Sequence, residues 1–197
     1  APNTDASAVD TWNNVDIAVN LTANDALSGV AATRYRIDGG DAQTGTQVSL
    51  SDEGVHSLEY WSVDQAGNAE PHKSVTVRID KSSPTISHAF VPLANSNGWF
   101  KDDVSVRFTC DDALSGIKSC GPDRVVSSEG KDQDASGEAV DYAGNKALDP
   151  ATVSLDRTAP TITASVDRPA NDDGWYDDDV TVSFACGDAL SGVDKCP

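Results

Sequence analysis

The sequence has little positive charge and no long hydrophobic run, and each absence excludes a class of partner. It holds 14 Lys and Arg residues against 32 Asp and Glu residues, for a formal net charge of -18. Because like charges repel, we expect no binding to nucleic acid or to an anionic membrane surface. No apolar run of about 18 residues and no signal peptide is present, so we expect a soluble chain without membrane insertion. Any export signal or anchor is expected outside it.

Motifs of common enzyme classes are also absent. The sequence has no Gly-x-Ser-x-Gly motif, no His-rich metal motif and no phosphate-binding glycine loop. Carboxylate pairs are frequent, but a catalytic pair needs an apolar pocket that raises one pKa, and small sandwiches rarely provide one. We therefore predict that the chain is not an enzyme. His56 is expected to be a hydrogen-bonded core residue and not a general base.

The same short motifs recur at domain-sized intervals. An Asp-Ala-Leu-Ser-Gly motif follows a Trp and an alternating segment three times, and an Asp-x-Ala-Gly-Asn motif occurs twice. The three tryptophans are Trp12, Trp99 and Trp175. Such intervals indicate a tandem array of small domains and not a solenoid. We predict domains at residues 1–80 and 81–156, and the first half of a third domain at 157–197.

Alternating apolar residues predict β-strands throughout. Val104, Val106, Phe108 and Cys110 share one face, with a period of two that a helix cannot use. The same pattern recurs in Ile17, Val19 and Leu21, in His56, Leu58 and Tyr60, and in Val180, Val182 and Phe184. Short strands with one buried face, joined by turns rich in Gly, Asn, Asp and Ser, are typical of two-sheet sandwiches. The predicted fold class is all-β, with tandem Ig-like β-sandwich domains in an elongated array.

The four cysteines form two equally spaced pairs. Cys110 and Cys120 flank the second Asp-Ala-Leu-Ser-Gly motif, and Cys186 and Cys196 flank the third. Two disulfides are the favoured interpretation; a zinc site is the alternative, although the three histidines lie outside these loops. In the chain-entropy model, a disulfide around a loop of this size adds on the order of 3 kcal/mol to the free energy of unfolding. Disulfides also indicate an oxidising compartment.

Taken together, these motifs resemble those of tandem bacterial Ig-like (Big-type) repeats of secreted and cell-surface proteins. The resemblance is carried by the Trp before an alternating strand, the Asp-x-x-Ser-Gly and Asp-x-Ala-Gly-Asn motifs, and the Asp-x-[Ser/Thr]-[Ala/Ser]-Pro-Thr segments. The second and third units are similar to a version common in actinobacterial secreted proteins. The first unit is similar to a variant found beside secreted carbohydrate-active domains. The resemblance implies an extracellular, secreted or cell-surface location.

The resemblance also implies calcium (Ca2+) at domain junctions, and the loop order of an Ig-like sandwich supports this. Both acidic motifs are expected at the end where the chain enters a domain, beside the Asp that ends the preceding one. Their carboxylate and carbonyl oxygens are the ligands that calcium prefers. The predicted metal ligands are Asp80, Asp111, Asp112, Asp141 and Asn145, with Asp156 and Asp188 at the second junction and Asp25, Asp64 and Asn68 in the first unit.

Each acidic motif also has a purely local interpretation. Asp112, Asp141 and Asn145 could serve only as turn residues, because Asp side chains close such turns and Gly144 supplies a positive φ. The excess of Asp over Glu has two explanations as well, which are calcium coordination and an acidic surface adapted to salt. The sequence leaves these alternatives open.

The tryptophans admit two interpretations, as core residues or as stacking platforms for sugars. Trp12, Trp99 and Trp175 each occupy the same position relative to the alternating strand that follows, so we predict that they are core residues. Trp61 lies next to Tyr60 and has no counterpart in the second unit. Trp61 is therefore the predicted exposed aromatic and the candidate ligand-binding residue.

Two functions fit these observations. The first is a non-catalytic extracellular structural or adhesive array that acts as a calcium-stiffened stalk, spacer or filament, with other Ig-like domains of the same or neighbouring subunits as partners. The alternative is a carbohydrate-binding or accessory module of a larger secreted glycan-active enzyme, with surface glycans as partners. Residues 157–197 are expected to supply about three strands with open edges, which further chain or another subunit in trans would have to complete.

Overall fold

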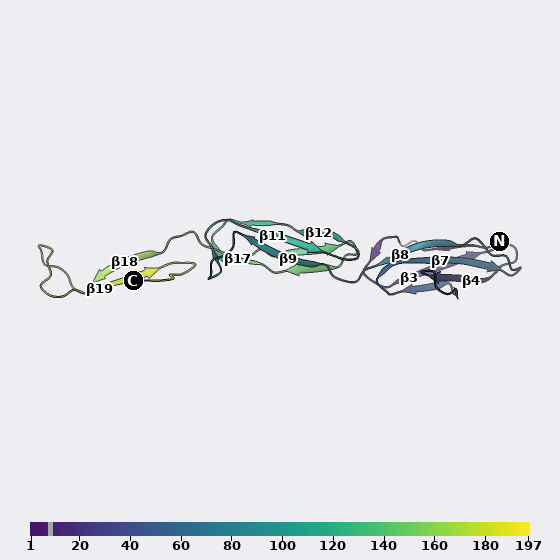
Figure 1. Ribbon diagram of the computed structural model, residues 1–197, viewed down its shortest axis with the longest axis horizontal. Coiled ribbons are helices and arrows are strands. Elements are labelled where there is room, and N and C mark those ends of the chain that lie inside the picture. The colour runs from purple at the N-terminus through teal and green to yellow at the C-terminus, as the bar shows by residue number, and fades with distance from the viewer. Residues whose placement is uncertain (8–9) are drawn as a thin grey trace. The chain divides into compact units, whose positions relative to one another are not determined.

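Every regular element of the described chain is a β-strand (Figure 1). The computed structural model describes residues 1–7 and 10–197, and the predicted all-β fold class is confirmed. The chain divides into two compact units. Unit 1 comprises Ala1–Ser87, Thr109–Gly121 and Glu138–Leu148, and unit 2 comprises His88–Phe108, Pro122–Gly137 and Asp149–Pro197. The domain boundaries after residues 80 and 156 stay a prediction.

The first eight strands form two sheets, in the orders β1-β3-β6 and β2-β8-β7-β4-β5. These strands are β1 (Asn3–Ala6), β2 (Trp12–Asn13), β3 (Ile17–Asn24), β4 (Val30–Ile37), β5 (Gln43–Thr44), β6 (Gln47–Leu50), β7 (Gly54–Asp64) and β8 (Lys73–Ile79). Alternate residues of both sheets meet in one core. The buried core residues are Val19, Leu21, Val48, Leu50, Leu58, Tyr60, Val77 and Ile79. This arrangement is an Ig-like β-sandwich.

The next nine strands form three sheets, in the orders β13-β11-β9, β10-β17-β14 and β12-β15-β16. These strands are β9 (Thr85–Val91), β10 (Trp99–Phe100), β11 (Val104–Asp111), β12 (Ile117–Gly121), β13 (Arg124–Val126), β14 (Gly130–Asp134), β15 (Gly137–Asp141), β16 (Lys146–Asp149) and β17 (Thr152–Leu155). Val104 and Val106 of β11 are fully buried, as their alternation predicts, and they pack with Val153 and Leu155 of β17.

Gly137 marks a close contact within unit 2. It is buried at the start of β15, and a Cβ atom added there would lie 2.5 Å from the Phe108 ring. We predict that Gly137→Ala lowers the free energy of unfolding by about 1–3 kcal/mol, because Phe108 must leave its position to admit the methyl group. Chemical denaturation measures the loss. Gly187→Ala is the control, since a Cβ atom there meets only an ordinary contact at 3.7 Å. Equal losses in the two variants would contradict the packing argument.

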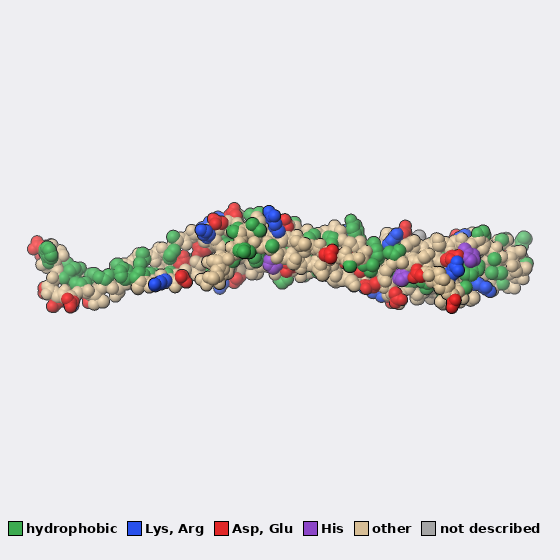
Figure 2. Space-filling view, in the orientation of Figure 1, with side chains coloured by type: hydrophobic (Ala, Val, Ile, Leu, Met, Phe, Trp, Pro, Cys, Tyr) green, Lys and Arg blue, Asp and Glu red, His purple; other side chains and the backbone are tan. Residues whose placement is uncertain are grey.

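The last two strands, β18 (Thr161–Val166) and β19 (Val182–Gly187), form a separate antiparallel pair. The prediction of about three strands after residue 157 is wrong, because the described structure has two and Val180 precedes β19. Val182 and Phe184 are 50% and 46% exposed, since the sheet that they belong to has no further strand. Figure 2 shows hydrophobic side chains along the visible surface of this part of the chain.

The prediction that all three repeated tryptophans are core residues is also wrong. Trp12 and Trp99 are only partly buried, on the short strands β2 and β10. These strands pair in parallel with β8 and β17, the last strands of their repeats. Trp175 is 74% exposed and lies outside any strand. Among the described residues, no strand pairs beside Trp175 as β8 and β17 pair with β2 and β10.

Two further aromatic predictions concern Trp61 and His56. Trp61 is 8% exposed and its ring stacks on His72, with 4.0 Å between centroids, so the prediction of an exposed ligand-binding aromatic is wrong. His56 is hydrogen-bonded as expected, from Nδ1 to Asp38 Oδ2 at 2.8 Å and from Nε2 to the Asp52 carbonyl at 3.0 Å. It is partly buried and does not belong to the core cluster. The hydrogen bond with Asp38 raises the pKa of His56.

Candidate metal centre

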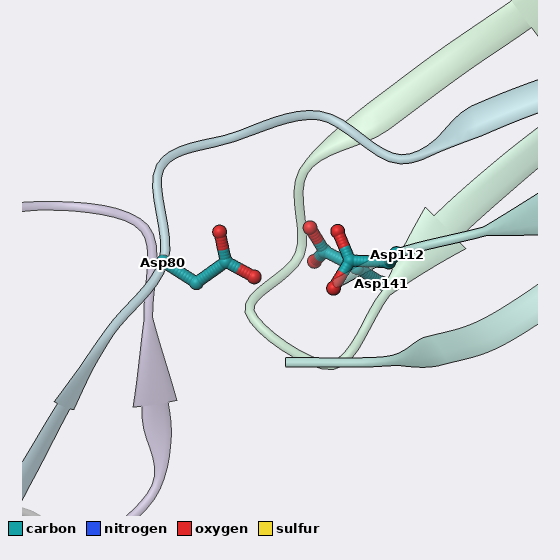
Figure 3. Close-up of side chains that lie close together, drawn as sticks. All are labelled: Asp80, Asp112 and Asp141. Atoms are coloured by element: carbon teal, nitrogen blue, oxygen red, sulfur yellow. The ribbon is translucent and has the colours of Figure 1, made fainter. Parts of the chain in front are cut away.

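Three of the predicted metal ligands lie together in unit 1 (Figure 3). Asp80 follows β8, Asp112 follows β11, and Asp141 is the last residue of β15. One carboxylate oxygen from each residue lies within 4.8 Å of the others. Asp80 and Asp141 are fully buried, and Asp112 is partly buried. The sequence order of the motifs thus predicted a cluster whose members are far apart in the chain.

Local turns position two of the three carboxylates. Oδ1 of Asp112 accepts hydrogen bonds from the backbone of Leu114 at 3.2 Å and of Gly116 at 2.7 Å. Oδ1 of Asp141 accepts hydrogen bonds from the backbone of Gly144 at 2.6 Å and of Asn145 at 2.8 Å. The interpretation of these residues as turn residues therefore holds for one oxygen of each side chain. It does not explain why the two turns meet.

Asp80 and Asn145 connect the two turns. Oδ2 of Asp80 accepts the backbone N–H of Ser115 at 3.0 Å, and its Oδ1 accepts that of Ser82 at 3.1 Å. The Asn145 side-chain amide donates to the Asp80 carbonyl at 2.8 Å and to Asp141 Oδ2 at 2.7 Å. The contact with Ser115 was not predicted from the sequence. The signal that could have indicated it is the repeated Asp-Ala-Leu-Ser-Gly motif, in which Ser115 is the Ser.

In the described part of the chain, no basic side chain balances the charge of this cluster. Among residues 1–7 and 10–197, no Lys, Arg or His forms an ion pair with Asp80, Asp112 or Asp141. Three carboxylates at this separation repel one another in a partly desolvated site. Their oxygens are hard ligands, which suit calcium better than the softer metals that Cys and His bind. The donor chemistry fits a calcium ion held by these three residues.

Asp111 does not belong to the cluster, and its predicted place there is wrong. Its side chain is exposed, while its carbonyl accepts a hydrogen bond from Thr85 Oγ1 at 3.1 Å. The reason is local, because Asp111 is the last residue of β11, whereas Asp112 begins the following turn and caps it with its own side chain. Asp112 therefore turns toward the cluster and Asp111 turns away.

A related pair of carboxylates lies in unit 2. Oδ2 of Asp156 accepts the backbone N–H of Ser191 at 3.0 Å, and Oδ1 of Asp188 accepts those of Leu190 at 3.1 Å and Gly192 at 2.9 Å. Hydrogen bonding from Ser191 lowers the pKa of Asp156, although burial opposes the effect. The printed sequence has no third Asp-x-Ala-Gly-Asn motif, so this pair has no counterpart of Asp141.

The first repeat also holds two of the predicted acidic ligands. Oδ1 of Asp64 accepts the Asn68 backbone N–H at 2.8 Å, and Oδ2 accepts its side-chain amide at 2.9 Å. The Asn68 side chain is the main cause that lowers the pKa of Asp64. Oδ2 of Asp25 lies 3.5 Å from the α-ammonium group of Ala1. The predicted role of all these residues as calcium ligands stays a prediction.

Both predicted disulfides are confirmed. Cys110 is bonded to Cys120 and Cys186 to Cys196, with Cα atoms 5.9 Å apart in each pair. All four cysteines are oxidised, so the zinc alternative is excluded. Each bond joins the two ends of an Asp-Ala-Leu-Ser-Gly loop, which limits the motion of Asp112 and Asp188. The first repeat has Ala23 in place of the first cysteine.

The described residues include no helix that is long and apolar enough to cross a membrane. Asp and Glu side chains are spread over the visible face of the molecule and do not gather in one patch (Figure 2). The acidic cluster of unit 1 is thus distinguished by burial and convergence, not by a general concentration of charge.

No protein-family model matches this chain, and no curated protein matches it. Among solved structures, it is similar to fibronectin(III)-like modules of Clostridium thermocellum CbhA, with 14% identity and a TM-score of 0.40, over 79% of this chain and 95% of that one. It is also similar to a tetra-tandem repeat in the extending region of a large adhesion protein, with 16% identity and a TM-score of 0.29. That match covers 98% of this chain and 65% of the other.

Proposed function

We propose that this chain is a non-catalytic structural or adhesive array of Ig-like modules that functions outside the cell, as a secreted or surface stalk, spacer or filament. Calcium bound by Asp80, Asp112 and Asp141 stiffens the connection between the predicted domains 1–80 and 81–156. The observation that carries this proposal is the convergence of three carboxylates from three distant elements, none of which forms an ion pair with a basic side chain among residues 1–7 and 10–197. The two disulfides support an oxidising compartment.

Calcium at this cluster would act as a crosslink between segments that are far apart in sequence. Asp80 belongs to the segment that leaves β8, while Asp112 follows β11 and Asp141 ends β15, both in the next repeat. An ion that needs all three carboxylates binds only when these segments are docked. Calcium therefore favours the docked arrangement over one in which the segment after Asp80 bends freely.

Small-angle X-ray scattering tests this function directly. We expect the maximum dimension of the chain to be larger and better defined in millimolar calcium than in chelator, while circular dichroism shows the same strand content in both. The sandwich made by β1 to β8 has its own core, so loss of calcium should loosen the connection without unfolding that sandwich. Identical scattering and melting profiles in calcium and chelator would show that the acidic motifs are turn residues only.

The second candidate function is sugar binding, and a different residue now supports it. Trp61 is buried, but Trp175 and Tyr176 are adjacent in sequence and are 74% and 40% exposed. Flat exposed aromatic faces suit the apolar face of a sugar ring. A polysaccharide pull-down that depends on Trp175, and not on Trp61, would favour this candidate.

A further inference from the structure

Two glutamates occupy equivalent turns, and each binds the linker that follows the last strand of its own repeat. Glu53 directly precedes β7, within the sequence Ser-Asp-Glu-Gly, and Glu129 directly precedes β14, within the sequence Ser-Ser-Glu-Gly. The linkers are residues 80–82 after β8 and residues 156–158 after β17. Each Glu lies 28 residues before the first linker residue that it binds. The same contact is therefore made twice, in two separate parts of the chain.

In unit 1, the turn of Glu53 holds the two residues that follow Asp80. Glu53 Oε1 accepts the backbone N–H of Lys81 at 2.6 Å. The two oxygens of the same carboxylate accept the Ser82 hydroxyl at 3.1 Å and 3.2 Å. The Lys81 ammonium group in turn pairs with Asp16, the residue before β3. Hydrogen bonds to an ionised acceptor are shorter and stronger than those between neutral groups, so this turn restrains the linker.

In unit 2, the turn of Glu129 makes the same contacts with the residues that follow Asp156. Glu129 Oε1 accepts the backbone N–H of Arg157 at 2.6 Å, and the carboxylate accepts the Thr158 hydroxyl at 3.1 Å and 3.3 Å. The Arg157 guanidinium group pairs with Asp103, the residue before β11. The two linkers thus differ in sequence, with Lys in one and Arg in the other and with Ser in one and Thr in the other, but they present the same donors.

The contacts of Glu53 also reach the acidic cluster through Asp80. The Ser82 backbone N–H donates to Asp80 Oδ1 at 3.1 Å, while Asp80 Oδ2 accepts the Ser115 backbone N–H at 3.0 Å. Ser82 is therefore held by Glu53 at its hydroxyl and by Asp80 at its backbone. Because this residue is fixed from two sides, the Asp80 carboxylate has fewer conformations available to it. A group that is held in its binding conformation loses less freedom when a ligand binds.

We propose that Glu53 and Glu129 are linker clamps, and that Glu53 is a positioning residue of the candidate calcium centre. Each carboxylate fixes its linker without metal and limits the directions that the Asp at the start of the linker can take. For Asp80 this arrangement favours the conformation that faces the cluster, and a larger competent population binds an ion at lower concentration. The clamps themselves are independent of calcium, whereas the role of Glu53 toward Asp80 rests on the proposed function.

Amide hydrogen exchange by NMR, in chelator, tests the clamps. Glu53→Ala should speed exchange of the Lys81 amide about tenfold, the effect of losing a hydrogen bond to a charged acceptor, and should leave Arg157 unchanged. Glu129→Ala should have the reverse effect, so each variant is the control for the other. Asp52→Ala removes the same charge from the residue next to Glu53 and should change neither amide. Unchanged exchange at Lys81 in Glu53→Ala, or an equal rise in all amides of β8, would overturn the clamp.

A calcium titration followed by NMR at the Ser115 amide tests the positioning role. We expect the Kd of Glu53→Ala to be about fivefold higher than that of the wild type, and the Kd of Asp52→Ala to equal it. Wild-type affinity in Glu53→Ala would overturn the positioning role. A wild-type chain that binds no calcium would contradict the proposed function and the positioning role together, whereas the exchange rates in chelator would still decide whether Glu53 clamps the linker.

Discussion

Replacing Asp141 with Asn should remove most of the stabilisation that calcium gives to the chain, whereas Asp111→Asn should leave it intact. An ion bound only by the folded site adds about 2.7 kcal/mol to the free energy of unfolding when its concentration is a hundred times Kd. Asp141→Asn removes one of three charged ligands, but its remaining side-chain oxygen can still accept the Gly144 and Asn145 backbone N–H groups. The turn should therefore persist while calcium affinity falls.

Urea unfolding in calcium and in chelator measures this difference for each variant. Asp111 is the matched control because it has the same charge and is adjacent to Asp112, but its side chain is exposed and outside the cluster. In chelator, Asp111→Asn should unfold close to the wild-type midpoint, whereas Asp141→Asn should unfold somewhat earlier because it loses the acceptor of the Asn145 side-chain amide, so the calcium effect is compared within each variant. If the two variants respond equally to calcium, the buried cluster is not the site that binds it.

Glu70→Ala should lower the free energy of unfolding by about 3 kcal/mol. The Glu70 carboxylate is buried and accepts the backbone N–H of Thr4 at 3.1 Å and of Ser62 at 2.9 Å, together with the Thr4 hydroxyl. Lys73 Nζ lies 3.4 Å away. Truncation leaves two buried N–H donors without an acceptor, at a cost of about 1–3 kcal/mol each, partly relieved by water entry. Because Thr4 lies on β1, that strand should be the first to detach.

Hydrogen exchange of β1 and urea unfolding together check the Glu70 prediction. Glu138→Ala is the control, since Glu138 is 41% exposed and only pairs with Lys146 on the surface, where an ion pair contributes little. A Glu70→Ala protein with wild-type stability and a protected β1 would contradict the proposed role of this carboxylate.

The Glu70 carboxylate also makes the free energy of unfolding depend on pH. Burial by itself would raise the pKa of Glu70, but hydrogen bonds from Thr4 and Ser62 and the charge of Lys73 bring it below its ordinary value of 4.5. A group with a lowered pKa in the folded state stabilises the fold fully above the ordinary value, and this contribution is lost as pH falls through the lowered one. Glu70→Gln should therefore lose less stability than the wild type between about pH 5 and pH 3.

The sequence alone determined those features that depend on local pattern and on repetition. The period-two alternation of residues such as Val19 and Val106 predicted strands and their buried faces, because a strand places alternate side chains on opposite sides. The equal spacing of the cysteines favoured the two disulfides. The fixed order of the acidic motifs predicted that Asp80, Asp112 and Asp141 would meet, since the sandwich topology brings those loops to one end.

The tertiary structure alone decided which individual side chains enter the core and the acidic cluster. Asp111 and Asp112 are neighbours of the same residue type, and only the structure shows that Asp111 ends β11 with an exposed side chain while Asp112 closes the next turn beside the cluster. Trp61 is buried because His72 stacks on it, and Glu70 became a buried acceptor because β1 and β7 present N–H groups to it. No motif marks either contact. Each contact depends on residues that come from different elements, and a local sequence pattern does not indicate which residues pack against it.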